Sequence, residues 1–329
     1  MTRVLVTGAA GFIGFHLSTR LLALGHEVVG VDNLNAYYDP TLKQARLDQL
    51  LPQPGFSFVR LDLADRDAVA ALFAGVRPEL VVHLAAQAGV RFSLENPFAY
   101  TDSNITGTLT VLEGCRHNGV KHLVYASSSS VYGANRDLPF ATSDRADSPM
   151  SMYAATKRAN ELMAYTYSHL FGLPTTGLRF FTVYGPWGRP DMSMFLFTKA
   201  ILAGEPITVF NRGQMSRDFT FVGDVVNVLE RVVESSPPTA RDGEGASPPC
   251  RVYNVGNNSP VALLDMIAAI ERAVGVPAKK IFEGMQAGDV PATYANVDDL
   301  VRDYDYKPST TIDDGVRRFV EWYRTYFKV

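Results

Sequence analysis

The sequence contains little cysteine, little excess charge of either sign and no long apolar run. Only two of its 329 residues are cysteines, Cys115 and Cys250, and neither lies in a CxxC or Cys/His cluster, which argues against a disulfide framework or a structural zinc. The net charge of −3 gives no general electrostatic reason to expect nucleic acid or an anionic membrane as partner. The apolar run near the start is about one strand long, far below the ~20 residues of a membrane span. We therefore expect a cytoplasmic protein with no metal, nucleic-acid or membrane partner.

Hydrophobic residues make up 47% and charged residues 20% of the chain, an ordinary composition for a globular protein with a sizeable core. Short β-branched runs alternate with longer segments of helical period, a pattern typical of a parallel sheet covered by helices. The expected strands are residues 3–7, 28–31, 56–61, 80–84, 122–126 and 175–181. The expected helices include residues 104–117, 152–171, 263–274 and 313–327.

This alternation ends near residue 181. Beyond it, Pro and Gly interrupt shorter elements, and residues 235–249 (SSPPTARDGEGASPP) indicate an exposed loop. The expected fold class is α/β, a Rossmann-type doubly wound parallel sheet with a smaller C-terminal substrate-binding lobe. We expect the nucleotide-binding domain at residues 1–181, completed by parts of 219–258, and the lobe mainly at 182–329.

A glycine-rich loop connects the first expected strand to the helix after it. Its GxxGxxG pattern allows a tight turn and a close approach of the backbone to a pyrophosphate. The free N–H groups and positive dipole at the start of the helix would then bind the phosphates. A plain glycine turn is the alternative interpretation. The predicted dinucleotide contacts in this loop are Gly8, Gly11, Phe12, Ile13 and Gly14.

Asp32 lies at the end of the second expected strand, where its carboxylate can accept both ribose hydroxyls of an adenosine and repel a 2′-phosphate. This predicts NAD rather than NADP as the cofactor, although an Asp here also suits a turn. Asp62 suits the adenine edge, and the small residues Ala85 and Ala86 leave room for a flat cofactor, although each would equally suit a core. The other predicted cofactor contacts are Asn33, Leu63, Leu84, Gln87, Asn104, Tyr153 and Lys157.

Tyr153 and Lys157 stand at positions i and i+4, which places them on one face of a helix. A phenol, with a pKa of ~10, needs a nearby cation to act as a base at neutral pH, and Lys157 together with NAD+ would supply it. A Tyr-xxx-Lys pair alone often marks a solvated helix face. Here four serines, Ser127 to Ser130, follow another expected strand, at the edge where open α/β sheets place ligands. One hydroxyl would bridge a substrate hydroxyl and Tyr153, and at least two are expected to serve only a turn.

The glycine-rich loop, the strand-end serines and the Tyr-xxx-Lys pair together resemble the extended short-chain dehydrogenase/reductase superfamily, over essentially the whole chain. Within that superfamily the sequence is similar to the UDP-glucuronate 4-epimerases. Two residues depart from the family pattern: Gly223 stands where an acid is common, and Phe92 where a tyrosine is usual. The matching stretches are residues 32–39 (DNLNAYYD), 87–93 (QAGVRFS) and 184–192 (YGPWGRPDM).

The resemblance implies roles for individual residues. It makes Ser128 the catalytic serine, Tyr153 the acid/base and Lys157 its partner, and it implies that Asn104 steadies the active-site helix. It also implies a bound nucleotide sugar, with small hydroxyls seating a uronate carboxylate and an Arg–Asp pair holding the UDP portion. Thr182 and Arg189 are assigned to the carboxylate region, and Arg217 and Asp289 to the UDP. The full set of predicted substrate contacts is Arg91, Ser93, Ser127, Ser128, Ser129, Ser130, Thr182, Arg189, Arg217 and Asp289.

The activity implied by the resemblance is reversible epimerisation of UDP-glucuronate at C4 to UDP-galacturonate, through a 4-keto intermediate and tightly bound NAD. Related dehydratases and decarboxylases carry a carboxylate beside the serine, whereas Ser129 and Ser130 precede Val131 here. General acid catalysis contributes a factor of about 10²–10⁴ in rate, so the absence of this carboxylate argues strongly against dehydration. UDP-glucose 4-epimerase, a catalytically inactive NAD-binding sensor and a net dehydrogenase are the alternatives. A homodimer through the helices at 104–117 and 152–171 is also expected, as in relatives.

Overall fold

The computed structural model describes residues 1–240, 247–286 and 289–329. It divides into two compact units. Unit 1 comprises residues 1–135, 145–179 and 226–253, and unit 2 comprises residues 136–144, 180–225 and 254–329. The expected boundary after residue 181 lies two residues from the division after 179, and the segment 226–253 falls within the predicted 219–258. That residues 136–144 belong to unit 2 was not expected from the sequence.

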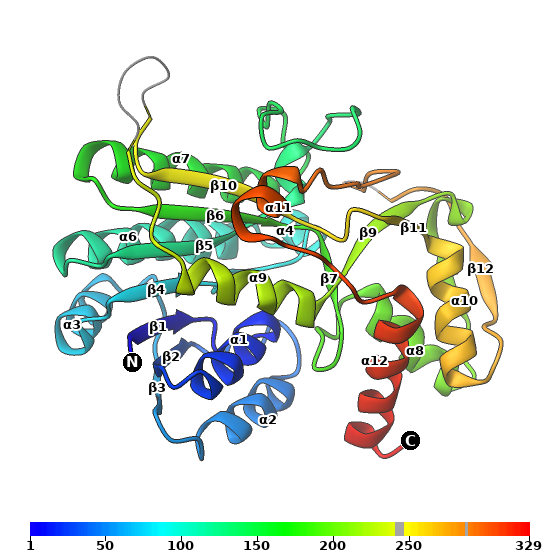
Figure 1. Ribbon diagram of the computed structural model, residues 1–329. Helices are drawn as coiled ribbons and strands as arrows, with labels where there is room; N and C mark the ends of the chain where they lie inside the picture. Colours follow the sequence, from blue (N-terminus) through cyan, green and yellow to red (C-terminus); the bar gives the residue numbers. More distant parts are fainter. Residues whose placement is uncertain (241–246, 287–288) are drawn as a thin grey trace. The chain divides into compact units, whose positions relative to one another are not determined.

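Among the described residues, a seven-stranded sheet is the centre of unit 1, with the strand order β10-β6-β5-β4-β1-β2-β3 (Figure 1). The paired registers are parallel: Thr7 of β1 lies opposite Val31 of β2 and opposite His83 of β4. This order, in which the chain moves outward from β1 in both directions, is that of a doubly wound sheet, as predicted. The strands are β1 (Arg3–Thr7), β2 (Glu27–Asp32), β3 (Phe56–Arg60), β4 (Leu80–His83), β5 (His122–Ser128), β6 (Thr175–Phe180) and β10 (Cys250–Val255).

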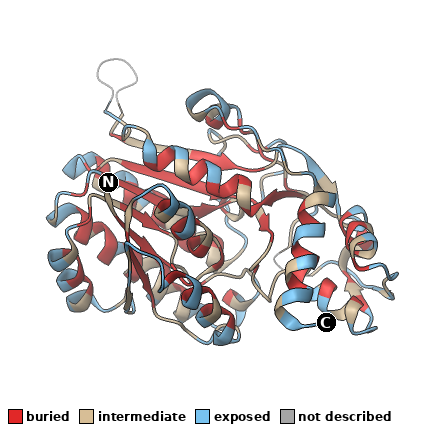
Figure 2. Cartoon of the chain, turned by 60° about the horizontal axis from the view of Figure 1, so that its bottom comes forward, coloured by how far each residue is buried: buried red, intermediate tan, exposed pale blue. Residues whose placement is uncertain are grey.

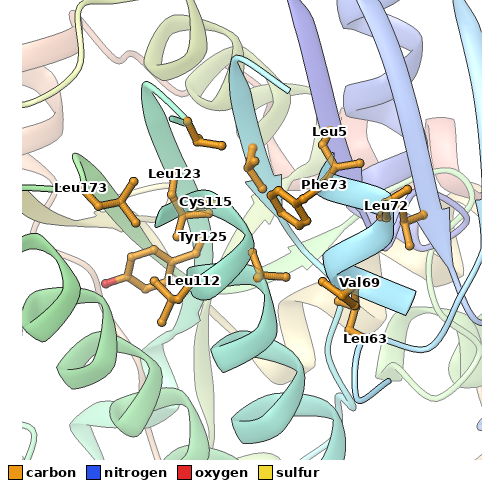
Figure 3. Close-up of a cluster of buried hydrophobic side chains, with 14 of the residues drawn as sticks. Leu5, Leu63, Val69, Leu72, Phe73, Leu112, Cys115, Leu123, Tyr125 and Leu173 are labelled. Carbon is orange, nitrogen blue, oxygen red and sulfur yellow. The ribbon is translucent and has the colours of Figure 1, made fainter. Parts of the chain in front are cut away.

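Helices cover this sheet, and their buried sides and the buried strands stand out in Figure 2. On one face, side chains of alternate strand residues such as Leu5 and Leu123 pack against Phe73 and Leu112 from two helices (Figure 3). Burying large apolar side chains of this kind stabilises the fold by roughly 1.5–3 kcal/mol each. The helical elements of unit 1 are α1 (Phe12–Ala23), α2 (Pro40–Leu50), α3 (Arg66–Val76), α4 (Phe92–Glu95), α5 (Pro97–Tyr100), the π-helical turn η1 (Thr101–Thr106), α6 (Gly107–His117), the 3₁₀ turn η2 (Ser129–Tyr132), α7 (Met152–Phe171) and the later part of α9 (Val222–Glu234).

Unit 2 has shorter strands, in two small sheets. One sheet has the order β11-β9-β7, with β7 parallel and β11 antiparallel to β9, and the other pairs β12 with β8 in parallel. The segment 136–144 joins this unit through Phe140, whose N–H donates to Tyr294 and whose carbonyl accepts from Asn296. The elements are β7 (Thr182–Tyr184), α8 (Ser193–Leu202), β8 (Ile207–Val209), η3 (Phe210–Gly213), β9 (Ser216–Phe221), β11 (Pro260–Ala262), α10 (Leu263–Val274), β12 (Lys280–Phe282), α11 (Asp298–Tyr304) and α12 (Ile312–Phe327).

Two predicted elements need correction. The helix expected at 104–117 is α-helical only from Gly107, because a π-helical turn precedes it and contains Asn104. The strand expected to end at Ala126 continues to Ser128, so two of the four serines belong to a strand. The helices at 152–171 and 263–274 are confirmed, and the C-terminal helix begins one residue earlier than expected. Of the expected loop 235–249, residues 241–246 lie outside the described residues.

In the part of the chain that the structure describes, no helix is both long enough and apolar enough to cross a membrane.

Candidate active site

The glycine-rich loop connects β1 to α1, and two of its glycines leave no room for a side chain. Gly8 has a φ of +74°, and a Cβ added there would lie 2.8 Å from the backbone nitrogen of Ala85. A Cβ on Gly14 would lie 2.1 Å from the carbonyl oxygen of Gly8. Gly11 precedes the first residue of α1 and makes no side-chain cap, so the first N–H groups of this helix face the loop without one. Gly8, Gly11, Gly14 and the first N–H groups of α1 form a glycine cradle that fits a pyrophosphate.

Asp32 is the last residue of β2, the strand beside β1, and it is buried. One of its carboxylate oxygens accepts the N–H of Leu34 at 2.9 Å, so Asp32 also has the turn role that was the alternative interpretation. Next to it, Asn33 donates its side-chain amide to Asp62 at 3.0 Å. Two strand ends of unit 1 thus bring Asp32 and Asp62, the two acids predicted for the adenosine, together with the predicted cofactor contact Asn33.

The apolar residues predicted for the cofactor lie at three other positions. Leu63, after β3, is buried in the core cluster of unit 1. Leu84, Ala85 and Ala86 follow β4 and are half-buried, at the strand end that Gly8 approaches. Phe12 is buried and Ile13 is half-buried in the first turn of α1. Taken with the glycine cradle and Asp32, the residues present fit a dinucleotide.

Tyr153 and Lys157 lie in the first turns of α7, which begins after Ser151, a residue whose hydroxyl accepts the N–H of Ala154. Lys157 is buried and its ammonium donates to the carbonyl oxygen of Ala126 at 2.9 Å. Burial lowers the pKa of Lys157 to about 8. The side chain of Tyr153 is half-buried, with its ring edge-on to Tyr100. A lysine with so low a pKa, one helical turn from a tyrosine, is suited to proton transfer near neutral pH.

The four serines divide into two structural pairs. Ser127 and Ser128 end β5, while Ser129 and Ser130 begin the 3₁₀ turn η2, so two of the four lie in a turn and their substrate contacts stay predictions. The hydroxyl of Ser128 accepts the N–H of Ser130 and donates to its hydroxyl, both at 3.2 Å. Ser127 is buried, and its hydroxyl donates to the carboxylate of Glu161 at 2.6 Å. The substrate contact expected of Ser127 stays a prediction, since this hydroxyl already has a structural partner.

Glu161 is a site residue that the sequence interpretation missed. Its buried carboxylate accepts two hydrogen bonds from Arg179, at 2.8 and 2.9 Å, and one from Arg158 at 2.9 Å. Burial by itself would raise the pKa of Glu161, but Arg179 and the donors from Ser127 and Arg158 together lower it. The spacing Tyr153, Lys157, Glu161 at i, i+4 and i+8 was the available signal, because it continues one helix face.

Asn104 connects α7 to the loop after β4. Its side chain accepts the N–H of Gln87 at 2.8 Å and donates to the carbonyl of Gln87 and to the hydroxyl of Thr156. Its own carbonyl accepts from the side chain of Asn160 at 2.7 Å. Thr156 and Asn160 lie on either side of Lys157 in α7, and these hydrogen bonds are consistent with the expected role of Asn104 in steadying this helix. π-helical turns inside helices are frequent at functional sites.

The loop between β4 and α5 carries two predicted substrate contacts that differ in exposure. Arg91 is exposed, whereas Ser93 is buried and donates its hydroxyl to the carbonyl of Val90 at 2.6 Å. Phe92, one of the departures from the family pattern, packs against Tyr37 and Tyr100. Phe92, which stands where the family usually has a tyrosine, thus keeps an aromatic ring in contact with these two tyrosines.

In unit 2, Thr182 begins β7 and is half-buried. Arg189 lies in the loop after β7 and forms an ion pair with Asp191, with Nε 3.0 Å and Nη2 2.5 Å from the carboxylate oxygens. The positive charge that the sequence suggested for Arg189 is therefore balanced within its own loop. Trp187, in the same loop, packs on Trp322 of α12 with ring centroids 5.2 Å apart, a contact the sequence interpretation missed.

Arg217 and Asp289 come together within unit 2 although they are far apart in sequence. Arg217 is on β9, and its Nη2 lies 3.9 Å from a carboxylate oxygen of Asp289. Arg217 also donates to the carbonyl of Pro291 at 3.2 Å. An arginine and an acid so arranged can bind a phosphate and a donor group of a base. The neighbouring Gly288 lies outside the described residues.

No group of three or more His, Cys, Asp or Glu suited to a metal ion occurs in residues 1–240, 247–286 or 289–329.

The fold and these residues define a class of nucleotide-binding enzyme, and comparison with known proteins places the chain within it. The model of the NAD dependent epimerase/dehydratase family matches residues 4–256, and the chain belongs to this family. A probable UDP-glucuronate 4-epimerase of Rhizobium meliloti is 49% identical, over 98% of this chain and 96% of its own.

Two solved structures are similar over nearly their whole length. UDP-glucuronic acid 4-epimerase from Bacillus cereus, in complex with UDP-glucuronic acid and NAD, has a TM-score of 0.90 and 32% identity, covering 98% of this chain and 99% of its own. UDP-glucose 4-epimerase from Thermotoga maritima, with UDP-glucose, has a TM-score of 0.87 and 27% identity, covering 99% of both chains.

Proposed function

We propose that the chain interconverts UDP-glucuronate and UDP-galacturonate by epimerisation at C4, with NAD as cofactor. The observation that carries the proposal is the placement of Tyr153 and buried Lys157 on α7 beside the end of β5, with Ser128 at that strand end and the glycine cradle in the same unit. Relatives and neighbours of known name that act on UDP-glucuronate support the substrate class.

In the proposed mechanism, Tyr153 removes the proton from the 4-hydroxyl of the sugar and returns it at the end of the reaction. Lys157 lowers the proton affinity of the phenol electrostatically. Ser128 hydrogen-bonds the reacting hydroxyl and holds it toward Tyr153. The glycine loop and Asp32 would hold NAD, which would supply a hydride acceptor and donor for C4 of the sugar. The 4-keto sugar turns over between these two transfers, so that the hydride returns to the opposite face and there is no net redox change.

Other outcomes from a 4-keto sugar require groups that this site does not supply at the expected place. Elimination of water needs an acid beside the serine, and residues 129 and 130 are both serines. A 4-keto uronate is also a β-keto acid and can lose CO₂. We propose that the hydroxyls of Ser129, Ser130 and Thr182 hold the carboxylate in the sugar plane, which disfavours this loss. Release of CO₂ or a pentose product at a rate close to that of epimerisation would contradict this.

We assign the UDP portion to Arg217 and Asp289 of unit 2. The support for this is their mutual approach and the guanidinium chemistry of Arg217, which suits a diphosphate. Arg189 is proposed to contribute to the carboxylate region only if its pair with Asp191 rearranges.

We also propose that the chain forms a homodimer in the cytoplasm. Helices α6 and α7 carry exposed apolar side chains, including Leu162 at 54% and Tyr165 at 51% exposure, and such patches often mark an interface between protein chains. Leu162→Glu is expected to give a monomer by light scattering. A wild-type monomer at micromolar concentration would contradict the dimer.

The proposed location in the cytoplasm is supported by the two free cysteines, Cys115 and Cys250, because disulfides are rare in that compartment.

The test of the proposed function is to give the purified protein UDP-glucuronate without added NAD and to follow the products by NMR. Appearance of UDP-galacturonate with its carbon count intact is the expected result, and it would imply that NAD co-purifies. Conversion that begins only after NAD is added would keep the chemistry and contradict tight cofactor binding. Conversion of UDP-glucose alone would favour the UDP-glucose 4-epimerase alternative, and stoichiometric NADH release a dehydrogenase. Reducible NAD with no turnover would favour a sensor.

A further inference from the structure

Asp218 is a fully buried carboxylate in unit 2, directly after Arg217 on β9. It has no part in the mechanism above. Burying a carboxylate costs several kcal/mol unless hydrogen bonds compensate. A buried Asp that accepts hydrogen bonds from specific donors is therefore expected to have a structural or functional role. The donors of Asp218 show what that role is.

The carboxylate connects β9 to two other segments of unit 2. One oxygen accepts the N–H of Asn257 at 2.5 Å, and the other accepts the N–H of Ala295 at 3.1 Å. The backbone N–H of Asp218 donates to the hydroxyl of Thr293 at 3.3 Å. Gly256 makes the approach possible, because a Cβ there would lie 2.5 Å from the Cβ of Ala295 and 3.0 Å from the Asp218 carboxylate. A single side chain thus fixes β9, the turn after β10 and the segment around Ala295.

That last segment also carries the partner of Arg217. Ser216 donates its N–H to the carbonyl of Pro291, and Thr293 donates its N–H back to the carbonyl of Ser216. Arg217 donates to the same Pro291 carbonyl, and Asp289 lies two residues before it. The position of Asp289 relative to Arg217 therefore depends on how the segment 289–295 is attached to β9.

We infer that Asp218 is a positioning residue for the nucleotide part of the substrate: through Ala295 and Thr293 it fixes the segment that sets Asp289 beside Arg217. This rests on the proposed function, because it takes Arg217 and Asp289 to be the residues that hold UDP. The loss of the carboxylate would leave buried N–H groups without acceptors and would loosen this segment. The reacting groups Tyr153 and Lys157 belong to unit 1, so the effect falls on UDP binding and leaves the chemical step alone.

The experiment measures the Kd of UDP by calorimetry, and KM, kcat and Tm with UDP-glucuronate, for the full-length wild type and four variants. Asp218→Asn keeps the shape of the side chain but replaces one acceptor with a donor, and it is expected to weaken UDP binding and raise KM at least about tenfold with kcat within about twofold. Thr293→Val removes one contact of the same arrangement and is expected to weaken UDP binding about threefold. It carries the test if Asp218→Asn does not fold.

Asp224→Asn is the matched control, because Asp224 is also a buried carboxylate of unit 2 and accepts a backbone N–H from Thr310, which is outside the segment 289–295. It is expected to lower Tm and leave the Kd of UDP unchanged. Equal effects of Asp218→Asn and Asp224→Asn on Kd, or a fall in kcat without a rise in KM, would overturn the inference. Arg217→Met tests the proposed UDP site separately from the role of Asp218. If Arg217→Met weakens UDP binding while Asp218→Asn and Thr293→Val do not, only the inference about Asp218 fails. If Arg217→Met has no effect either, the proposed UDP site fails with it.

Discussion

The two units hold their proposed functional residues by different means. In unit 1 these residues stand at strand ends and on one helix face, so regular secondary structure sets their positions: Ser128 ends β5, and Lys157 lies one helical turn after Tyr153 on α7, where it reaches the carbonyl of Ala126 in the same strand. In unit 2, Arg217 and Asp289 lie on separate segments that are joined mainly by backbone hydrogen bonds and by Asp218. A regular sheet places reacting groups through local sequence, whereas a substrate lobe depends on long-range contacts.

The buried charges show the same difference. Glu161 in unit 1 is paired with Arg179 and bonded to Ser127, so that one ion pair stiffens the strand end where Ser128 lies. Asp218 in unit 2 takes its hydrogen bonds from backbone N–H groups instead, and burial raises its pKa. We therefore expect changes in unit 1 to act on turnover, cofactor or global stability, and changes in unit 2 to act on substrate affinity.

The strongest test of this comparison is Tyr153→Phe. Removal of the phenolic hydroxyl is expected to cut turnover by about 10²–10⁴-fold, because it removes the general acid/base, while the NAD content and the Kd of UDP stay unchanged. Steady-state kinetics, cofactor release on heating and calorimetry measure the three quantities. Near-normal turnover would remove Tyr153 from the base role, and a weakened Kd of UDP would break the separation between the units.

The next largest effect is expected for Glu161→Gln. It leaves the Arg179 guanidinium buried without its charged partner, which typically costs about 3–5 kcal/mol of unfolding free energy. The control is Asp313→Asn, which breaks an ion pair with Arg272. The side chains of this pair are exposed, at 61% for Arg272 and 62% for Asp313. Such surface pairs contribute about 0–1 kcal/mol. Denaturant unfolding that found equal losses for the two variants would contradict the structural role of the Glu161 network.

Acid is expected to destabilise unit 1 through two buried histidines. Burial, with the nearby charge of Lys157, lowers the pKa of His83 to about 3, and burial lowers that of His122 to about 4. The unfolded chain takes up these protons near pH 6.5, so stability is lost as the pH falls below 6.5 toward the folded-state values. At pH 5 each ring should cost about 2 kcal/mol.

Chemical denaturation at pH 7.5, 6 and 5 measures this loss, and His122→Gln should make it smaller. His117→Gln, at an exposed histidine of the same unit, should leave it unchanged. A pH dependence that is the same in all three proteins would contradict the assignment to His122.

The smallest expected effect concerns the cofactor. Asp32→Ala should weaken NAD binding about tenfold, because a charged hydrogen-bond acceptor for the ribose is lost, and it should also reduce the discrimination against NADP. Reconstitution of cofactor-free protein with each dinucleotide measures both. An unchanged preference would mean that Asp32 serves only the turn through Leu34.

The difference between the units also explains what the sequence could predict. The glycine loop, Asp32 and the Tyr153–Lys157 pair follow from local patterns of strands, turns and helices, and the structure places them at the expected elements, whereas two of the four serines lie in the strand and not after it. The Arg217–Asp289 pair was expected only through resemblance to a family. Other contacts join distant segments: Glu161 with Arg179, Asp218 with Ala295, and residues 136–144 with the rest of unit 2. A single sequence has no local signal for such pairings, although the place of Glu161 on the face of Tyr153 and Lys157 could be read from its spacing. The π-helical turn at Asn104 was missed because its residues also suit an α-helix.

The central claim is that unit 1 transfers one hydride away from C4 and back to the same carbon. Its most direct test uses UDP-glucuronate carrying deuterium at C4, incubated with the purified protein in ordinary water. The expected product is UDP-galacturonate that retains the deuterium at C4, observed by NMR. Loss of the label to solvent, or its appearance in released cofactor in proportion to product, would contradict it.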